Sequence, residues 1–291
     1  MLPWIMVAAL LGGCGSAGSS PAVDRLDGLR QQAGEALARY DEAVRAAGGA
    51  PFVPVGELTR QLGDWEPANG DYKQALSAGL VQAASTLPAA PKSAGTIAWA
   101  NGTSQDVRLI SADAALAQLH AAGTGDCSGC APLKVTGARL STMTVPTTRG
   151  SATVPAWDYT LDGTAVRLAR AAVDPSAIVR VTPPPRGADH PHEGLAIESA
   201  TTTTTSRDLT VTFTGAPGPS SKPCGADYGA EAAESELAVV VIIIEYRHAE
   251  HEACPAVGAQ RSTTVELSRP LGERAVLEVR QGLPVGLTIT G

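Results

Sequence analysis

One short segment of the chain combines an aromatic side chain with several carboxylates. Trp65 lies between Asp64 and Glu66, and Asp71 follows the turn signal Asn69-Gly70. Neighbouring carboxylates can act as general acid and base or bind a hard cation, although the spacing of a calcium-binding loop is missing. In the structural alternative, Trp65 anchors the loop to the core and Asp71 caps a helix that extends to about residue 86. These four residues form the candidate ligand-binding site.

A second chemically active group is the cysteine pair Cys127 and Cys130. Two cysteines at this spacing can cycle as a redox pair or supply half of a zinc site. A redox pair usually precedes a helix, whereas the strand-like residues 133–136 follow Cys130, and no second CxxC completes a zinc site. We therefore predict a structural disulfide between these cysteines, with redox exchange as the alternative.

The histidines form no recognisable metal-binding motif. Residues 248–252 read His-Ala-Glu-His-Glu, which matches neither HExxH nor HxxEH. We interpret this pentad as a charged hairpin tip. His190, His192 and Glu193 belong to a proline-rich loop that would lack the surrounding contacts needed to fix metal ligands. The sequence thus predicts no metal site and no cofactor.

The beginning of the chain has the pattern of a signal peptide followed by a cysteine. An apolar run over residues 2–11 leads through Gly12-Gly13 to Cys14. Such a run is too short to span a bilayer as a helix but suits a signal peptide. The order resembles the lipobox of bacterial lipoproteins, in which the chain is cleaved before the cysteine and the thiol is acylated. This resemblance implies a lipid anchor on Cys14 at the extracytoplasmic face of the cell membrane; the alternative is an ordinary secretory signal.

Composition and charge narrow the class of protein. Glycine contributes 31 residues and proline 21, which favours turn-rich β structure. The net charge of −7 comes without a basic cluster, so we expect no nucleic-acid partner. Apart from Cys14, four cysteines remain, an even number that predicts disulfides in an oxidising compartment. A domain boundary between the first two and the last two favours the pairs Cys127 with Cys130 and Cys224 with Cys254.

The first half of the chain predicts helices packed on an antiparallel sheet. Apolar residues recur every three or four positions over residues 24–44, the pattern of an amphipathic helix. Ser111 is suited to cap a short helix, and Asn101-Gly102 predicts a tight hairpin. Pro155 marks a bulge or an edge position in its strand. The strands expected in this half are residues 96–99, 107–110, 133–145, 152–161 and 164–173.

The second half is predicted to be wholly β. The apolar block at residues 237–244 lacks a polar face, so it should be a central strand covered on both sides. The other expected strands are residues 200–213, 263–267 and 275–279. The predicted organisation is a signal peptide (1–13), a flexible tether (14–23), an α+β domain (24–181), a proline-rich linker (182–194) and a sandwich-like β domain (195–291).

Three segments, together with the lipobox-like start, resemble uncharacterised lipoproteins of high-GC Gram-positive bacteria, the actinobacteria. They are Gly63-Asp64-Trp65-Glu66, the run from Cys127 to Val154-Pro155-Ala156-Trp157, and Arg269-Pro270-Leu271-Gly272-Glu273-Arg274. The last of these is similar to part of a small disulfide-containing β module in exported proteins. The resemblance implies no activity, cofactor or catalytic residue.

These features favour a lipid-anchored envelope protein that binds a wall polymer, a small molecule or another protein. One alternative is an exported hydrolase that uses the carboxylates of Asp64, Glu66 and Asp71. Another is a redox protein that uses Cys127 and Cys130. The sequence contains neither a Gly-x-Ser-x-Gly elbow nor a phosphate-cradling glycine loop, so an enzymatic function has the weaker support.

Overall fold

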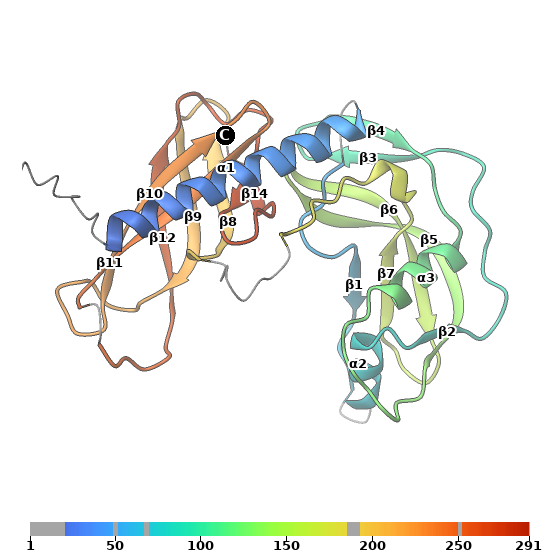
Figure 1. Ribbon diagram of the computed structural model, residues 1–291. Helices are drawn as coiled ribbons and strands as arrows, with labels where there is room; N and C mark the ends of the chain where they lie inside the picture. The colour runs from blue at the N-terminus through green and yellow to red at the C-terminus, as the bar shows by residue number, and fades with distance from the viewer. Residues whose placement is uncertain (1–20, 49–51, 67–69, 185–192, 250–251, 291) are drawn as a thin grey trace, which may run out of the picture.

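A computed structural model describes residues 21–48, 52–66, 70–184, 193–249 and 252–290. A long helix, α1 (Pro21–Ala47), runs beside two β-rich units, which we call the sheet unit (residues 52–184) and the sandwich unit (residues 193–290) (Figure 1). The fold is therefore broadly α+β, as predicted. The predicted signal peptide and most of the proline-rich linker lie outside the described residues.

Helix α1 starts at Pro21, three residues before the predicted start, so residues 21–23 of the expected tether are helical. Proline fits the first turn because its missing N–H has no intrahelical partner there. The chain leaves the helix at Gly48, whose φ of 62° suits a residue without a β-carbon. As the spacing predicts, one stripe is buried: Leu29, Ala33, Ala36, Leu37, Tyr40 and Val44. No helix among the described residues is long and apolar enough to cross a membrane.

The apolar stripe of α1 does not pack on the sheet that follows it in sequence. It packs instead on two strands of the sandwich unit, β11 (Ala238–Arg247) and β13 (Ala275–Glu278), where it meets Val240, Ile242 and Leu277. The expectation that the first helix covers the N-terminal sheet is wrong. Periodicity shows which face of a helix is apolar but not which apolar surface is available to cover it.

The sheet unit is a seven-stranded sheet covered by two shorter helices that contribute Ala75, Leu116 and Leu119 to its core. Helix α2 (Gly70–Ser77) ends far short of residue 86, because Gly79, at φ 68°, turns the chain into a short strand. Ser111 caps α3 (Ala112–Ala121) as predicted, by accepting a hydrogen bond from the Ala114 N–H. The strands are β1 (Thr59–Leu62), β2 (Val81–Ala83), β3 (Gly95–Trp99), β4 (Ser104–Val107), β5 (Leu133–Thr147), β6 (Gly150–Leu161) and β7 (Arg167–Ala171).

Strands β5, β6 and β7 form the predicted antiparallel meander, but β6 is central rather than an edge strand. Pro155 is tolerated in β6 because of its position. Its carbonyl accepts a hydrogen bond from the Ala172 N–H, so its nitrogen faces the same side. On that side the pairing with β3 ends at Thr153 and the pairing with β7 begins at Ala156. No partner strand therefore requires the missing N–H.

The sandwich unit contains a three-stranded sheet and a four-stranded sheet that enclose a shared core. The apolar block is strand β11, and it is covered on both faces as predicted. Val240 and Ile242 face α1, whereas Val239, Val241 and Ile243 face the other sheet. The single strand expected at residues 200–213 is a hairpin of two. The remaining strands are β8 (Ile197–Thr203), β9 (Asp208–Gly215), β10 (Ala226–Glu234), β12 (Ala259–Glu266) and β14 (Gly286–Thr290).

The two units touch each other through the turn between β5 and β6. The Arg149 guanidinium lies 4.6 Å from the ring centroid of Trp99 in the sheet unit and donates a hydrogen bond of 3.3 Å to Glu273 in the sandwich unit. Val53 and Val179 of the sheet unit also join the core between α1 and β11. Helix α1 and this turn therefore connect the two units.

Candidate functional site

The loop that carries Trp65 connects the edge strand β1 to helix α2. Gly63 follows β1 with a φ of 89°, a conformation that a residue without a β-carbon adopts readily, and so turns the chain out of the sheet. Asp64, Trp65 and Glu66 come next, and Asp71 lies in the first turn of α2. The loop is thus held at both ends by regular structure.

The ring of Trp65 is half-buried and packs against the core of the sheet unit. Its partner is Tyr72 of α2, in an edge-to-face arrangement with ring centroids 6.3 Å apart. The indole Nε1 is buried and has no hydrogen-bond acceptor among the described residues. An unpaired buried N–H costs about 1–3 kcal/mol. Because the nitrogen is closed to solvent, a ligand acceptor would pair with it only after neighbouring groups move aside.

The carboxylates of Asp64, Glu66 and Asp71 are exposed and do not gather into a cluster of the kind that holds a metal ion. Among the described residues, only one group of three metal-ligating side chains has its ligand atoms within 4.8 Å of one another, and Asp64, Glu66 and Asp71 do not belong to it. The loop therefore does not form a three-carboxylate cation site. Its distinctive features are an aromatic pair and an unpaired donor with acidic groups around them.

The other tryptophans of the sheet unit have structural roles. Trp99 donates its indole N–H to Thr147 Oγ1 at 3.1 Å, and Trp157 donates to the Ile110 carbonyl at 3.0 Å. Both rings are buried in the core. Trp65 differs from them because its N–H lacks an acceptor.

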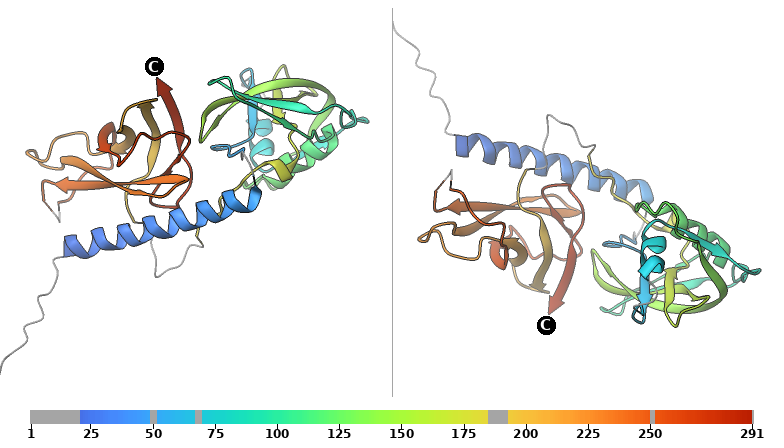
Figure 2. Two further views of the ribbon diagram at one scale, coloured as in Figure 1. Left: turned by 90° about the horizontal axis from the view of Figure 1, so that it is seen from above. Right: turned by 90° about the horizontal axis from the view of Figure 1, so that it is seen from below.

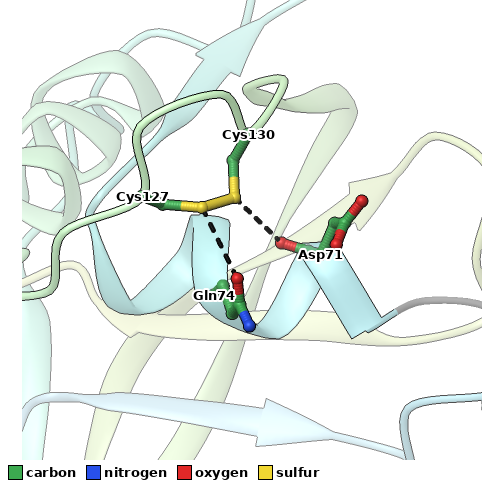
Figure 3. The surroundings of a disulfide bond; sticks show 4 residues. All are labelled: Asp71, Gln74, Cys127 and Cys130. Atoms are coloured by element: carbon green, nitrogen blue, oxygen red, sulfur yellow. Dashed lines mark hydrogen bonds between the residues drawn. A yellow bond between two sulfur atoms is a disulfide. The ribbon is translucent and has the colours of Figure 1, made fainter.

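Cys127 and Cys130 are disulfide-bonded, with Cα atoms 5.5 Å apart, and the bond lies against α2 (Figure 3). Cys127 Sγ is 3.7 Å from Gln74 Oε1, and Cys130 Sγ is 3.8 Å from the Asp71 carbonyl oxygen. Strand β5 follows the pair, so the context of a redox motif at a helix N-terminus is missing. The disulfide closes the loop before β5 on itself, and its sulfurs lie against the helix that carries Tyr72.

The sequence did not reveal a hollow of about 250 Å³ at one end of the sandwich unit. Its charged lining residues are Glu245, Arg247, His248 and Glu252, and the Cys224–Cys254 disulfide forms part of its wall. The cysteines and the histidine pentad were visible as a pattern. However, the hollow depends on two loops, the β9–β10 and β11–β12 connections, which meet only after folding.

The polar groups of this hollow are engaged with one another. Arg247 Nε donates to Glu245 Oε2 at 2.6 Å, and the Cys224 N–H donates to Glu252 Oε2 at 2.7 Å. Cys224, Glu252 and Cys254 are the three metal-ligating residues that lie together. Both sulfurs belong to the disulfide, so neither is available as the thiolate that a soft metal would need.

The three comparisons with known proteins give no relative for this chain. No protein-family model, no curated protein sequence and no solved structure matches it.

Proposed function

We propose that this chain is a lipid-anchored protein of the cell envelope, held at the extracytoplasmic face of the membrane, that binds a partner rather than catalysing a reaction. The anchor is the acylated thiol of Cys14, and the binding site is the Trp65 loop of the sheet unit. The partner is an envelope polymer, a small molecule or another protein.

The unpaired indole N–H of Trp65 carries the binding proposal. This donor belongs to the ring of Trp65, which packs edge-to-face against Tyr72. The same loop holds Asp64 and Glu66. An aromatic face with nearby acceptors suits a sugar ring or a cationic group, and the indole adds a donor for a ligand oxygen. Loops on a rigid scaffold are also where recognition residues concentrate.

The proposed location is supported by the lipobox-like segment before Cys14 and by the two disulfides, which are typical of an oxidising compartment. Its test is Cys14→Ser. The variant should move from the membrane fraction to the aqueous fraction and lose the mass of the acyl chains. Equal amounts of acylated, membrane-bound variant would refute the anchor.

The binding proposal is tested by screening envelope polysaccharides and extracts against the chain and two variants. Trp65→Phe keeps a ring but removes the N–H, and Trp65→Ala removes both. We expect capture to weaken about 5- to 20-fold for Phe, the range of one hydrogen bond of about 1–1.8 kcal/mol, and further for Ala. Ile289→Ala, at an exposed apolar position of the sandwich unit, is the control. If capture is unaffected by either Trp65 change in folded protein, the site lies elsewhere.

A further inference from the structure

The end of the sandwich unit that holds the Cys224–Cys254 disulfide exposes an apolar loop. Residues 253–258 read Ala-Cys-Pro-Ala-Val-Gly, are all exposed and include no charged side chain. Val257 is 63% exposed, and Tyr246, at the end of β11, is 56% exposed. These are two of the four large hydrophobic side chains exposed among the described residues. Because Cys254 ties the loop to Cys224, little conformational freedom remains to be lost when the loop meets a partner.

The direction of α1 relates this loop to the start of the chain. Arg30 forms an ion pair with Glu231, which lies opposite Ile242 in the β10–β11 ladder. Asp41 accepts a hydrogen bond from Ser235, just beyond the opposite end of that ladder. Helix α1 therefore runs antiparallel to β11. Its N-terminal end lies at the end of the sandwich unit where β11 finishes, which agrees with both views in Figure 2.

Covalent geometry limits the distance between Cys14 and this end of the molecule. Seven residue steps separate Cys14 from Pro21, a reach of at most about 25 Å when fully extended. The sheet unit, by contrast, follows the far end of α1, and a helix of 27 residues is about 40 Å long. An anchor on Cys14 would thus hold the apolar loop much closer to the bilayer than the Trp65 loop.

We propose that the end of the sandwich unit that carries Tyr246 and residues 253–258 docks onto the phospholipid bilayer that holds the anchor. Strand alternation puts Tyr246 on the α1 side of β11, and Val257 lies on the side of Glu245 and Arg247. This inference rests on the proposed lipid anchor. In the docked state, Val257 enters the boundary between head groups and acyl chains, and Tyr246 lies at head-group depth, where an amphipathic ring is favoured. Docking fixes the sandwich unit on the membrane and directs the Trp65 loop away from it.

The charges at this end are compatible with a phospholipid surface. Glu245 is paired with Arg247, Glu252 accepts from the Cys224 N–H, and Asp227 accepts from the Ser220 hydroxyl. Lys222 and His248 are exposed at the same end. A lysine stem can lie along the apolar surface while its ammonium group contacts lipid phosphates.

The first test uses the acylated chain reconstituted in phosphatidylcholine–phosphatidylglycerol vesicles with brominated acyl chains. Bromine quenches tryptophan fluorescence at short range, so Val257→Trp should be quenched at least twofold more than the unmodified chain. Leu140→Trp, at an exposed apolar position of the sheet unit, is the matched control and should add no quenching. Equal quenching of the two variants would overturn the docking proposal and leave the anchor untouched.

The second test separates docking from anchoring. The predicted mature chain, residues 14–291, carries Cys14→Ser so that no lipid is attached, and its binding to the same vesicles is measured by sedimentation. Tyr246→Ser combined with Val257→Ser should lower the bound fraction at least threefold, whereas Leu140→Ser should not. If the double variant binds as well as its parent, or if the parent does not bind, the docking surface is refuted. A wild-type chain isolated from cells without acyl chains would instead refute the anchor.

Discussion

Arg274 makes the most heavily connected buried ion pair of the sandwich unit, and replacing it should destabilise that unit. Its side chain is 4% exposed and forms an ion pair with Glu234. Arg274 also donates to the carbonyls of Arg269, Pro270 and Leu271 at 2.9, 3.2 and 3.1 Å. Arg274 thus holds the loop before β13 in place and connects it to β10.

The variant Arg274→Met keeps most of the stem and removes every donor. It leaves Glu234, 19% exposed, without its counter-ion and leaves three carbonyls without this donor. Breaking a buried ion pair costs about 3–5 kcal/mol, and because Glu234 is partly hydrated we expect the lower end, about 3 kcal/mol. Arg207→Met is the control, because the Arg207–Glu266 pair is 51% and 66% exposed and should contribute less than about 1 kcal/mol.

Stability is best read from native-state hydrogen exchange of the β11 amides, because Trp65, Trp99 and Trp157 all report on the sheet unit. The pH dependence gives a second readout. Burial raises the pKa of Glu234, but the hydrogen bonds from Arg274 and Ser268 and the Arg274 charge outweigh it, so the pKa lies below its ordinary value. A depressed carboxylate pKa stabilises the fold above the unfolded value of about 4.3, and this contribution is lost as the pH falls through the folded pKa.

We expect Arg274→Met to remove part of the acid sensitivity between about pH 5 and pH 2, the range in which a carboxylate with a lowered pKa takes up its proton. Two results would refute the reasoning. One is a loss of stability no larger than that of Arg207→Met. The other is an acid profile identical to that of the unmodified chain.

Three further predictions concern the crosslink, the contact between units and a buried phenol. Cys224→Ser should cost about 3–4 kcal/mol, because the disulfide to Cys254 closes a 30-residue separation; denaturation of the variant and of the unmodified chain, both without reductant, measures this. Arg149→Ala removes the contact with Glu273 and should broaden the interdomain distance distribution in small-angle scattering, while an unchanged curve would contradict its linking role. Burial raises the pKa of Tyr40 to about 12, although a hydrogen bond with Thr148 lowers it, so alkaline titration should show one phenol fewer near pH 12 in Tyr40→Phe. Because this pKa is raised, the associated stability is present below about pH 10 and is lost as the pH rises further.

Local chemistry made several features predictable from sequence. The apolar block in β11 has no polar side, so it required cover on both faces, and it receives cover from α1 and from the opposite sheet. The capping role of Ser111 depends on a residue three positions away. Both disulfide pairings are confirmed, with Cα separations of 5.5 Å, because the cysteines in each pair belong to the same unit.

Features that depend on distant residues were not predictable. The apolar stripe of α1 packs against strands about 200 positions later in the sequence. An apolar pattern shows which helix face is buried but not which strands cover it. The hairpin at β8 and β9 was also missed, since its threonine-rich residues 201–205 have strand propensity. The turn is set by side chains that cap the backbone: Ser206 N donates to Thr203 Oγ1, and Asp208 N donates to Ser206 Oγ.

The Trp65 side chain has one feature that the local sequence predicts and one that depends on distant residues. Sequence placed an aromatic residue and carboxylates in one loop, and the structure retains that loop against the core. The unpaired state of its N–H could not be foreseen, because it depends on which acceptors the fold brings near. The indole N–H of Trp99 donates to Thr147 Oγ1, and that of Trp157 donates to the Ile110 carbonyl. The indole N–H of Trp65 has no acceptor among the described residues.

The packing of α1 also bears on how binding at one unit would be transmitted to the other. Its buried stripe completes the core beside β11, and Val53 and Val179 of the sheet unit enter that same core. A displacement of the sheet unit relative to α1 would therefore expose apolar surface, at about 25 cal/mol for each Å². The shared core therefore resists a shift of the sheet unit relative to the sandwich unit. Under the proposed function, this packing keeps the Trp65 loop at a fixed distance from the start of α1.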